Sequence, residues 1–220
     1  MAESVPIKLS SPSCMVISGM TSCGKSHWTK RLLKHCNEMY DKPVKKILYC
    51  YTAYQDLFQD METEIENITF HKGPPSEQYL NEFVADGGHN ICVLDDMQST
   101  VTSSLEMEQL FTVHSHHKCI SVLFLVQNIF TQGKYARSLA LQAHYLVPMK
   151  SLRDRSQMAC LSRQIYPGKS NLLPQVFDDI VKMDKYPYLL IDISPHGDDR
   201  FRLRTHIFPG ENTIVYQPRP

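Results

Sequence analysis

The chain has 220 residues, 42% of them hydrophobic, and its 23 basic and 23 acidic side chains give a formal net charge of zero. This length suits one α/β domain, and the neutral balance argues neither for nor against a nucleic-acid partner. No apolar run reaches the roughly 18 residues of a membrane span, and we find no secretory h-region. Seven widely spaced cysteines without a C-x-x-C pair indicate reduced, mostly buried thiols in an intracellular protein and no cysteine zinc site.

The first predicted strand, residues 14–18, leads into a phosphate-binding loop. Residues 19–26 read Gly-Met-Thr-Ser-Cys-Gly-Lys-Ser, a complete G-x-x-x-x-G-K-[ST] motif, and a helix is predicted over 25–39. Glycines permit close backbone approach, and successive N–H groups then face the phosphates. Lys25 is expected to reach the β- and γ-phosphates, and Ser26 to bind Mg²⁺. The loop residues predicted to hold the nucleotide are Gly19, Thr21, Ser22, Cys23, Gly24, Lys25 and Ser26.

The next informative stretch is a strand that ends in two carboxylates. It follows predicted strands at 46–51 and 68–71 and predicted helices at 54–66 and 77–85. The apolar run Ile91–Leu94 ends in Asp95 and Asp96, a Walker B pattern. At the carboxyl end of a central strand, Asp95 would hold Mg²⁺, and Asp96 would polarise or orient the attacking water. The alternative is a strand that ends in a solvated acidic turn.

Predicted helices and strands also alternate in the second half of the chain. Ser103-x-x-Glu106 resembles a capping box that opens a helix towards His114. A buried strand over 120–126 ends at Gln127, whose amide would sense the γ-phosphate or hold water, the alternative being a simple strand-end cap. Further helices are predicted at 133–143, 152–164 and 174–183, and further strands at 144–147, 188–193 and 201–207, the last two as a hairpin.

These elements predict an α/β fold of the P-loop NTPase class. We expect a central, mostly parallel sheet flanked by helices, with a C-terminal β-hairpin. Residues 1–208 would form a single P-loop domain, and residues 209–220 a loosely ordered tail.

Charge is unevenly distributed along the chain. Residues 51–110 hold twelve acidic side chains and one lysine, whereas residues 131–170 hold seven basic side chains and one aspartate. This pattern indicates two ordinary solvated faces, a polyanion-binding surface, or complementary faces of neighbouring subunits. In the predicted basic helix, Arg153 and Arg155 could reach a neighbour's nucleotide, contact DNA phosphates, or pair with the acidic segment.

In combination, these motifs resemble the packaging ATPases of poxvirus-like and Maverick/Polinton-type DNA viruses, within the FtsK/HerA superfamily. The matching stretches are residues 18–26, 93–96, 116–117 with 122–128, 150–157 and 163–168. The resemblance implies a RecA/FtsK-like fold and a homo-oligomeric ring that uses ATP and Mg²⁺ to drive double-stranded DNA into a preformed capsid. It also implies a location inside the host cell, nuclear or cytoplasmic, or in the virion, and capsid-vertex or other assembly proteins as partners.

The resemblance also assigns roles to residues. Lys25 and Ser26 would bind nucleotide, Asp95 magnesium, Asp96 would be catalytic and Gln127 a sensor, and the trans-acting arginine would be Arg153 or Arg155. Many relatives carry glutamate in place of Asp96, so the shorter side chain leaves the water-activating group open.

Two rival functions remain at this point. A small nucleotide or nucleoside kinase fits the length, with the basic helix as a lid over phosphates, although Asp95, Asp96 and Gln127 suit attack by water better. A non-hydrolysing, nucleotide-dependent assembly scaffold would bind ATP without turning it over.

Overall fold

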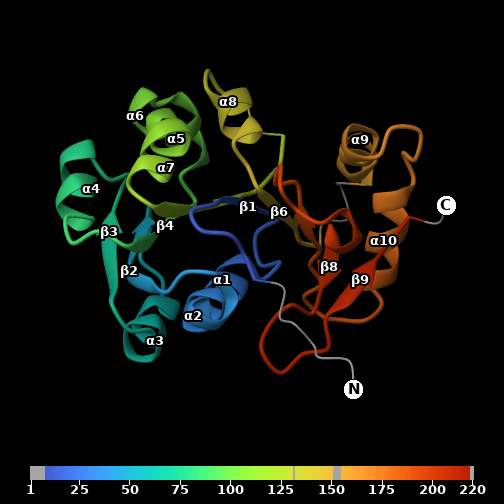
Figure 1. Cartoon of the computed structure of the whole chain (residues 1–220), viewed down its shortest axis with the longest axis horizontal. Coiled ribbons are helices and arrows are strands. Elements are labelled where there is room, and N and C mark those ends of the chain that lie inside the picture. The colour runs from blue at the N-terminus through green and yellow to red at the C-terminus, as the bar shows by residue number, and fades with distance from the viewer. Residues whose placement is uncertain (1–7, 131, 151–154, 219–220) are drawn as a thin grey trace.

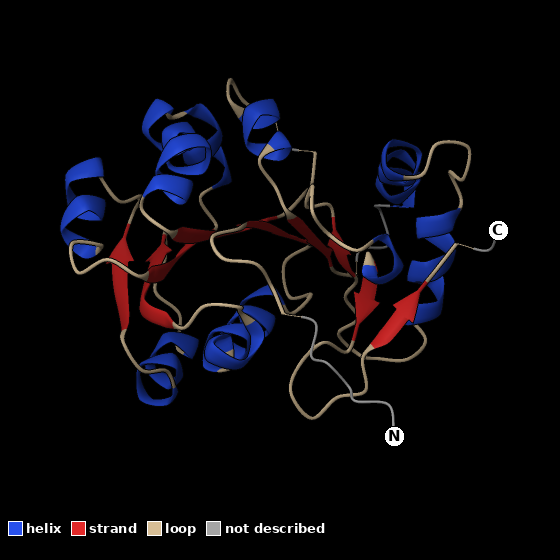
Figure 2. Ribbon diagram, in the orientation of Figure 1, coloured by secondary structure: helices blue, strands red, loops and turns tan. Residues whose placement is uncertain are grey.

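The computed structural model describes residues 8–130, 132–150 and 155–218, and within these ranges nine strands form one sheet. Figure 2 shows the strands as a single layer through the middle of the molecule. In chain order the strands are β1 (Cys14–Ser18), β2 (Val44–Tyr51), β3 (Ile68–Lys72), β4 (His89–Asp95), β5 (Ile120–Val126), β6 (Tyr145–Pro148), β7 (Leu190–Asp192), β8 (Leu203–Thr205) and β9 (Ile214–Tyr216).

The spatial order of the strands is β3-β2-β4-β5-β1-β6-β7-β8-β9. The first six run parallel, and β7, β8 and β9 continue the sheet as an antiparallel meander. Parallel strands need crossover connections, which explains why helices separate them in the sequence.

Helices cover both faces of the sheet (Figure 1). One face carries α1 (Lys25–Lys34), α2 (Cys36–Met39) and α3 (Leu57–Glu64). The other face carries α4 (Glu77–Phe83), α5 (Gln98–Ser103), α6 (Leu105–Gln109), a π-helical segment (Leu110–His114), α7 (Ser115–His117), α8 (Ala136–Leu141), α9 (Arg155–Ile165) and α10 (Leu172–Ile180). A short 3₁₀ helix, Asp199–Phe201, precedes β8. None of the helices in the described ranges is long and apolar enough to cross a bilayer.

Alternate residues of the central strands enter two separate cores. In β1, Cys14 and Val16 pack with the helices of the α4–α10 face, whereas Met15 and Ile17 pack with those of the α1–α3 face. All five residues of β1 are buried, as expected for a central parallel strand covered on both sides. The continuous apolar runs in β1, β4 and β5 therefore follow from two-sided burial.

The parallel register brings three strand ends to one edge. Ser18 of β1 lies beside Val126 of β5, and Leu125 of β5 lies beside Asp95 of β4. The loop that follows β1 and the polar residues that follow β4 and β5 therefore meet at the carboxyl edge of the sheet, where α/β folds bind their ligands.

Most predicted elements are confirmed, and the fold class is the predicted one. Several details differ, among them the following. The helix cap in the segment after β4 is Ser104, whose Oγ accepts from the Met107 N–H at 3.3 Å, because Ser103 still belongs to α5. The helix predicted over 25–39 is divided at His35 into α1 and α2. The tail predicted as loosely ordered contributes β9, which pairs with β8.

Candidate nucleotide-binding site

The phosphate loop joins the buried end of β1 to the start of α1. The Gly19 N–H donates to the Val126 carbonyl at 3.1 Å, which ties the loop to β5. A Cβ at Gly19 would lie 2.5 Å from the Cys23 sulfur, so a side chain has no room there. Gly24 has a φ of 101°, in the region that favours glycine, and it directly precedes the helix. The two glycines are therefore required by the path of the loop.

Lys25 is folded over the loop that it follows. Its Nζ donates to the carbonyl oxygens of Gly19 at 2.6 Å and Met20 at 3.1 Å. The ammonium group is thus held beside the backbone turn. Together with the N-terminus of α1, it makes this turn a positive environment for phosphate oxygens.

Asp95 is the last residue of β4 and is only 5% exposed. Its Oδ2 accepts a hydrogen bond from the Tyr49 hydroxyl of β2 at 2.7 Å. Burial and the neighbouring Asp96 charge raise the pKa of the Asp95 carboxyl, whereas the Tyr49 hydrogen bond, the Lys25 charge and the Ser26 hydroxyl favour its charged form. The site therefore contains a buried carboxyl group whose charge depends on its hydroxyl and ammonium neighbours.

Tyr49 itself was not predicted as a site residue. It lies in the middle of an apolar strand and is fully buried, and its hydroxyl reaches Asp95 because β2 pairs with β4. The sequence signal that could have pointed to it is a tyrosine within the apolar part of a predicted strand, since the hydroxyl of a tyrosine buried there needs a partner.

Asp96 and Gln127 follow β4 and β5 and are both exposed. Asp96 has a φ of 55°, a left-handed conformation that aspartate tolerates better than most residues, and its carbonyl accepts from the Thr52 hydroxyl at 3.0 Å. The Gln127 N–H donates to the Gln98 side-chain oxygen at 3.2 Å. Gln98, at the start of α5, is a second residue that the sequence did not single out.

These groups line one polar cavity of about 510 Å³. Most of the predicted site residues therefore converge at one place. The lining residues are Thr21, Ser22, Gly24, Lys25, Ser26, His27, Gln55, Asp56, Leu57, Asp95, Asp96, Leu125, Val126 and Gln127. Gly19 and Cys23 shape the loop behind this surface.

The residues present fit a magnesium–phosphate group. Within the described ranges, no group of three or more His, Cys, Asp and Glu side chains is placed to hold a metal on its own. Mg²⁺ does not require such a cage, since it keeps several waters and binds one or two carboxylates together with substrate phosphates. Ser26 and Asp95, the predicted ligands, supply a hydroxyl and a carboxylate in the same cavity as Lys25.

Of the two candidate arginines, Arg155 lies in the described part of the chain, and it is not among the residues that line this cavity. Arg155 begins α9, its side chain is 70% exposed, and it forms an ion pair with Asp178 of α10. Arg153 lies outside the described residues.

Comparison with known proteins finds no matching family model and no matching curated protein. Several solved structures are similar. The genome-packaging NTPase B204 of Sulfolobus turreted icosahedral virus 2, in complex with ATP-gammaS, has a TM-score of 0.56 and 11% identity over 94% of this chain and 98% of its own. The DNA-packaging ATPase B204 of Sulfolobus turreted icosahedral virus has a TM-score of 0.57 and 10% identity over 95% of this chain and 99% of its own.

A third similar structure is the flagellar accessory protein FlaH of Methanocaldococcus jannaschii, with a TM-score of 0.51 and 11% identity over 94% of this chain and 90% of its own. The fold is that of the P-loop NTPases. At identities near one in ten the similarity concerns the fold, so the chemistry of this chain must be argued from its own residues.

Proposed function

We propose that this protein is an ATPase that translocates double-stranded DNA into a preformed capsid, acting as a homo-oligomeric ring. The observation that carries the proposal is the convergence of Lys25, Ser26, Asp95, Asp96 and Gln127 on one cavity beside the phosphate loop. The similar solved structures named as packaging ATPases support the choice of packaging among the roles of this fold.

Each side chain has a definite task in this scheme. Lys25 and the loop N–H groups hold the β- and γ-phosphates, and Ser26 and Asp95 hold the metal. Bound Mg²⁺ supplies charge neutralisation on the phosphate oxygens. Asp96 accepts a hydrogen bond from the attacking water and Gln127 orients it, since both lie at strand ends that open to the cavity. This arrangement favours transfer to water.

The assembly is inferred from the resemblance and from the exposed side chain of Arg155. Arg155 lies outside its own subunit's phosphate cavity, which is consistent with an arginine that completes a neighbouring subunit's site. Contacts to DNA would be mainly to backbone phosphates and so tolerant of sequence. We place the protein in the FtsK/HerA group of viral motors, at an assembly site within the host cell, with capsid proteins as partners.

Steady-state ATP hydrolysis, with and without double-stranded DNA over a salt series, tests the proposal. We expect DNA to stimulate hydrolysis, the stimulation to fade as salt rises because phosphate contacts release counterions, and Lys25→Ala to abolish both. Hydrolysis that ignores DNA at every salt concentration would contradict translocation.

The same experiment separates the two rivals. A nucleotide or nucleoside kinase would release little inorganic phosphate, and on addition of an acceptor nucleoside it would transfer the γ-phosphoryl group to that acceptor and form ADP. A scaffold would bind ATP with negligible turnover, with or without DNA, even at concentrations where the ring forms.

A further inference from the structure

A second hollow, of about 690 Å³, adjoins the phosphate cavity. Ser22, Gly24 and His27 line both spaces, so the end of the phosphate loop forms the wall between them. The two spaces differ in chemistry. The phosphate cavity presents charged and hydroxyl groups, whereas the second hollow also has aromatic walls, made by the rings of Trp28, Tyr186, Tyr188, His206 and Phe208.

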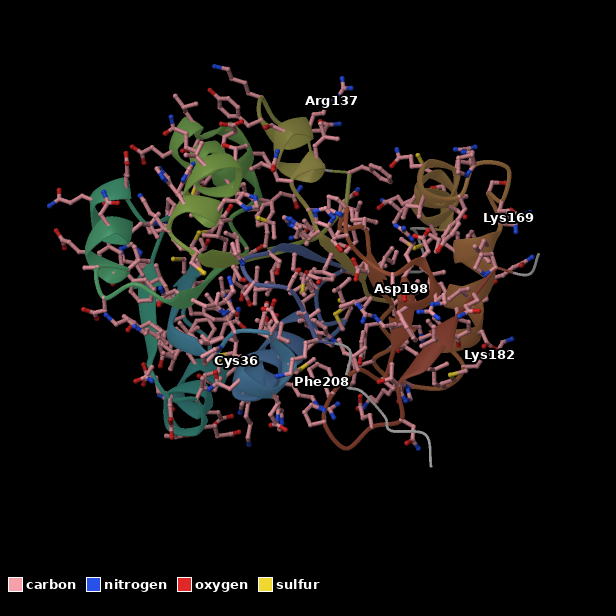
Figure 3. All side chains as sticks on the ribbon, viewed as in Figure 1. Cys36, Arg137, Lys169, Lys182, Asp198 and Phe208 are labelled. Atoms are coloured by element: carbon pink, nitrogen blue, oxygen red, sulfur yellow. The ribbon has the colours of Figure 1, made fainter. Side chains whose placement is uncertain are left out.

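Two of these rings form a fixed wall with α1. Tyr188 and Phe208 are buried, and each lies 5.5 Å from the Trp28 ring, centroid to centroid, in an edge-on arrangement. Figure 3 shows Phe208 beside α1. This cluster is part of the α1–α3 core, so it holds the hollow open in a defined shape next to the phosphate loop.

Tyr186 differs from the other rings because it is 53% exposed. It lies between α10 and β7, and its Cδ1 is 3.3 Å from the position that a Cβ on Gly24 would occupy. The ring therefore contacts the last glycine of the phosphate loop. It presents an aromatic surface to solvent within reach of any ligand anchored in that loop.

Lys185 lies with its Nζ 5.4 Å from the Tyr186 ring centroid, and the other charged groups around the hollow are engaged with one another. Arg31 pairs with Glu211 at 2.5 Å and lies 4.2 Å above the Phe208 ring. Asp184 Oδ2 lies 2.6 Å from His206 Nε2. The hollow therefore suits an uncharged, flat group with polar edges better than a further phosphate, since aromatic walls with a few polar groups are typical of such sites.

We propose that this hollow is the nucleobase subsite and that Tyr186 stacks on the base of the nucleotide whose phosphates lie in the loop. The inference rests on the proposed function, because it requires that the loop binds a nucleoside triphosphate. The volume of the hollow lies within the roughly 300–1,000 Å³ that is typical of small-molecule sites. A nucleotide that crosses the shared wall would place its phosphates beside Lys25 and its base beside Tyr186.

Binding of two magnesium-loaded ligands, ATPγS and inorganic tripolyphosphate, tests this assignment by calorimetry. We expect Tyr186→Ala to raise the Kd for ATPγS about tenfold, as typical of a lost base–aromatic stack, and to leave the Kd for tripolyphosphate unchanged. Tyr186→Phe keeps the ring and should bind ATPγS like the unaltered protein. Because Tyr186 is exposed, both variants should melt at the unaltered temperature.

Tyr54→Ala is the matched control, since this tyrosine is 51% exposed and lines neither space. A selective loss of ATPγS binding in Tyr54→Ala would place the base on the other side of the loop and overturn the inference. A Tyr186→Ala variant that binds ATPγS normally would also overturn the inference. Equal loss of both ligands in Tyr186→Ala would overturn it as well, because Tyr186 would then support the conformation of the phosphate loop.

Lys25→Ala distinguishes a failure of the nucleobase-subsite proposal from a failure of the proposed function. If Lys25→Ala loses both ligands while Tyr186→Ala binds ATPγS normally, the phosphate site stands and only the subsite is wrong. If Lys25→Ala binds both ligands like the unaltered protein, the loop is not the nucleotide site, and both proposals fail.

Discussion

Asp95 is subject to two opposing effects at the residue scale. Its burial raises the pKa of the carboxyl, yet binding of Mg²⁺ requires the carboxylate. The Tyr49 hydroxyl, 2.7 Å from Oδ2, favours the charged form. The hydrogen bond from Tyr49 to Asp95 therefore offsets part of the cost of desolvating the carboxylate, which must stay charged to bind a metal.

Tyr49→Phe removes the hydrogen bond and leaves the aromatic packing. Without this donor the pKa of Asp95 rises further, so a higher pH is needed to ionise it, and the acid limb of the kcat/KM profile moves to higher pH. We expect activity on that limb to fall about fivefold, the effect of one hydrogen bond, with the alkaline plateau preserved. Tyr51→Phe, on the same strand, is the control. A limb that stays in place or moves to lower pH would show that Tyr49 does not act through Asp95.

Asp95→Asn should stabilise the nucleotide-free protein while abolishing magnesium-dependent hydrolysis. The pKa of Asp95 is higher in the folded state than in the unfolded state. Ionisation of Asp95 therefore lowers the free energy of unfolding as the pH rises from the unfolded-state pKa to the folded-state pKa, and this loss persists at higher pH. The amide removes this loss and still accepts from Tyr49. We expect Tm at pH 7 to rise, by about 2–4 °C for each kcal/mol recovered. A lower Tm at pH 7 would contradict the account.

At the element scale, the segments around the phosphate loop were predictable because several signals agree there. The loop motif, the buried strand before it and the apolar spacing of Trp28, Leu32 and Leu33 all point to the same strand–loop–helix unit, and α1 buries those three side chains. The run ending in Asp95 is likewise a strand, in the central position expected of it.

Other elements depend on contacts that the local sequence does not specify. The segment Gln98–Ser103 is polar, and α5 forms because Val101 and Thr102 are buried against the sheet. Among the described residues, the three residues of β9 pair with β8 only. The Tyr49–Asp95 and Gln98–Gln127 contacts require the register of β2 and the start of α5, so neither could be predicted from spacing.

The antiparallel extension of the sheet contains an ion pair between a buried arginine and a half-buried aspartate of neighbouring strands. Arg204 of β8 is 2% exposed, and its Nη2 donates to Asp192 Oδ2 of β7 at 3.3 Å. Asp192 also accepts from the Ser194 N–H at 3.1 Å. The pair therefore joins β7 and β8 within the core, where each charge depends on the other.

Arg204→Ala should destabilise the fold by about 3–5 kcal/mol, because it leaves the Asp192 carboxylate, whose side chain is only 12% exposed, without its counter-charge. Urea denaturation measures the loss. The double variant Arg204→Met with Asp192→Asn should regain most of it, since both charges are then removed. A single substitution that costs less than about 1 kcal/mol would show that water already reaches Asp192.

At the scale of the whole molecule, part of the acidic segment is balanced within the subunit. Glu64 accepts from Lys30 at 2.7 Å and Lys34 at 2.9 Å, and Asp86 pairs with Lys46 at 2.5 Å. These pairs support the interpretation of this part of the segment as an ordinary solvated face. They leave the basic segment around α9 as the better candidate for contact with a neighbour or with DNA.

Mixing variants tests whether an arginine acts between subunits. Lys25→Ala lacks the nucleotide site and Arg155→Ala lacks the arginine, so neither should hydrolyse ATP alone. If the arginine acts in trans, an equimolar mixture should regain about a quarter of the normal rate, the share of random interfaces that pair an intact loop with an intact arginine. Arg153→Ala is tested in parallel. If neither mixture exceeds the mean of its components, no arginine at these positions acts in trans.

Displacement of a third strand from a DNA triplex tests the central claim, that nucleotide hydrolysis moves this protein along double-stranded DNA. We expect the unaltered protein with ATP to release the third strand, and no release with ATPγS or with Lys25→Ala, because movement requires turnover at the phosphate loop. DNA-stimulated hydrolysis that leaves the third strand in place would contradict translocation.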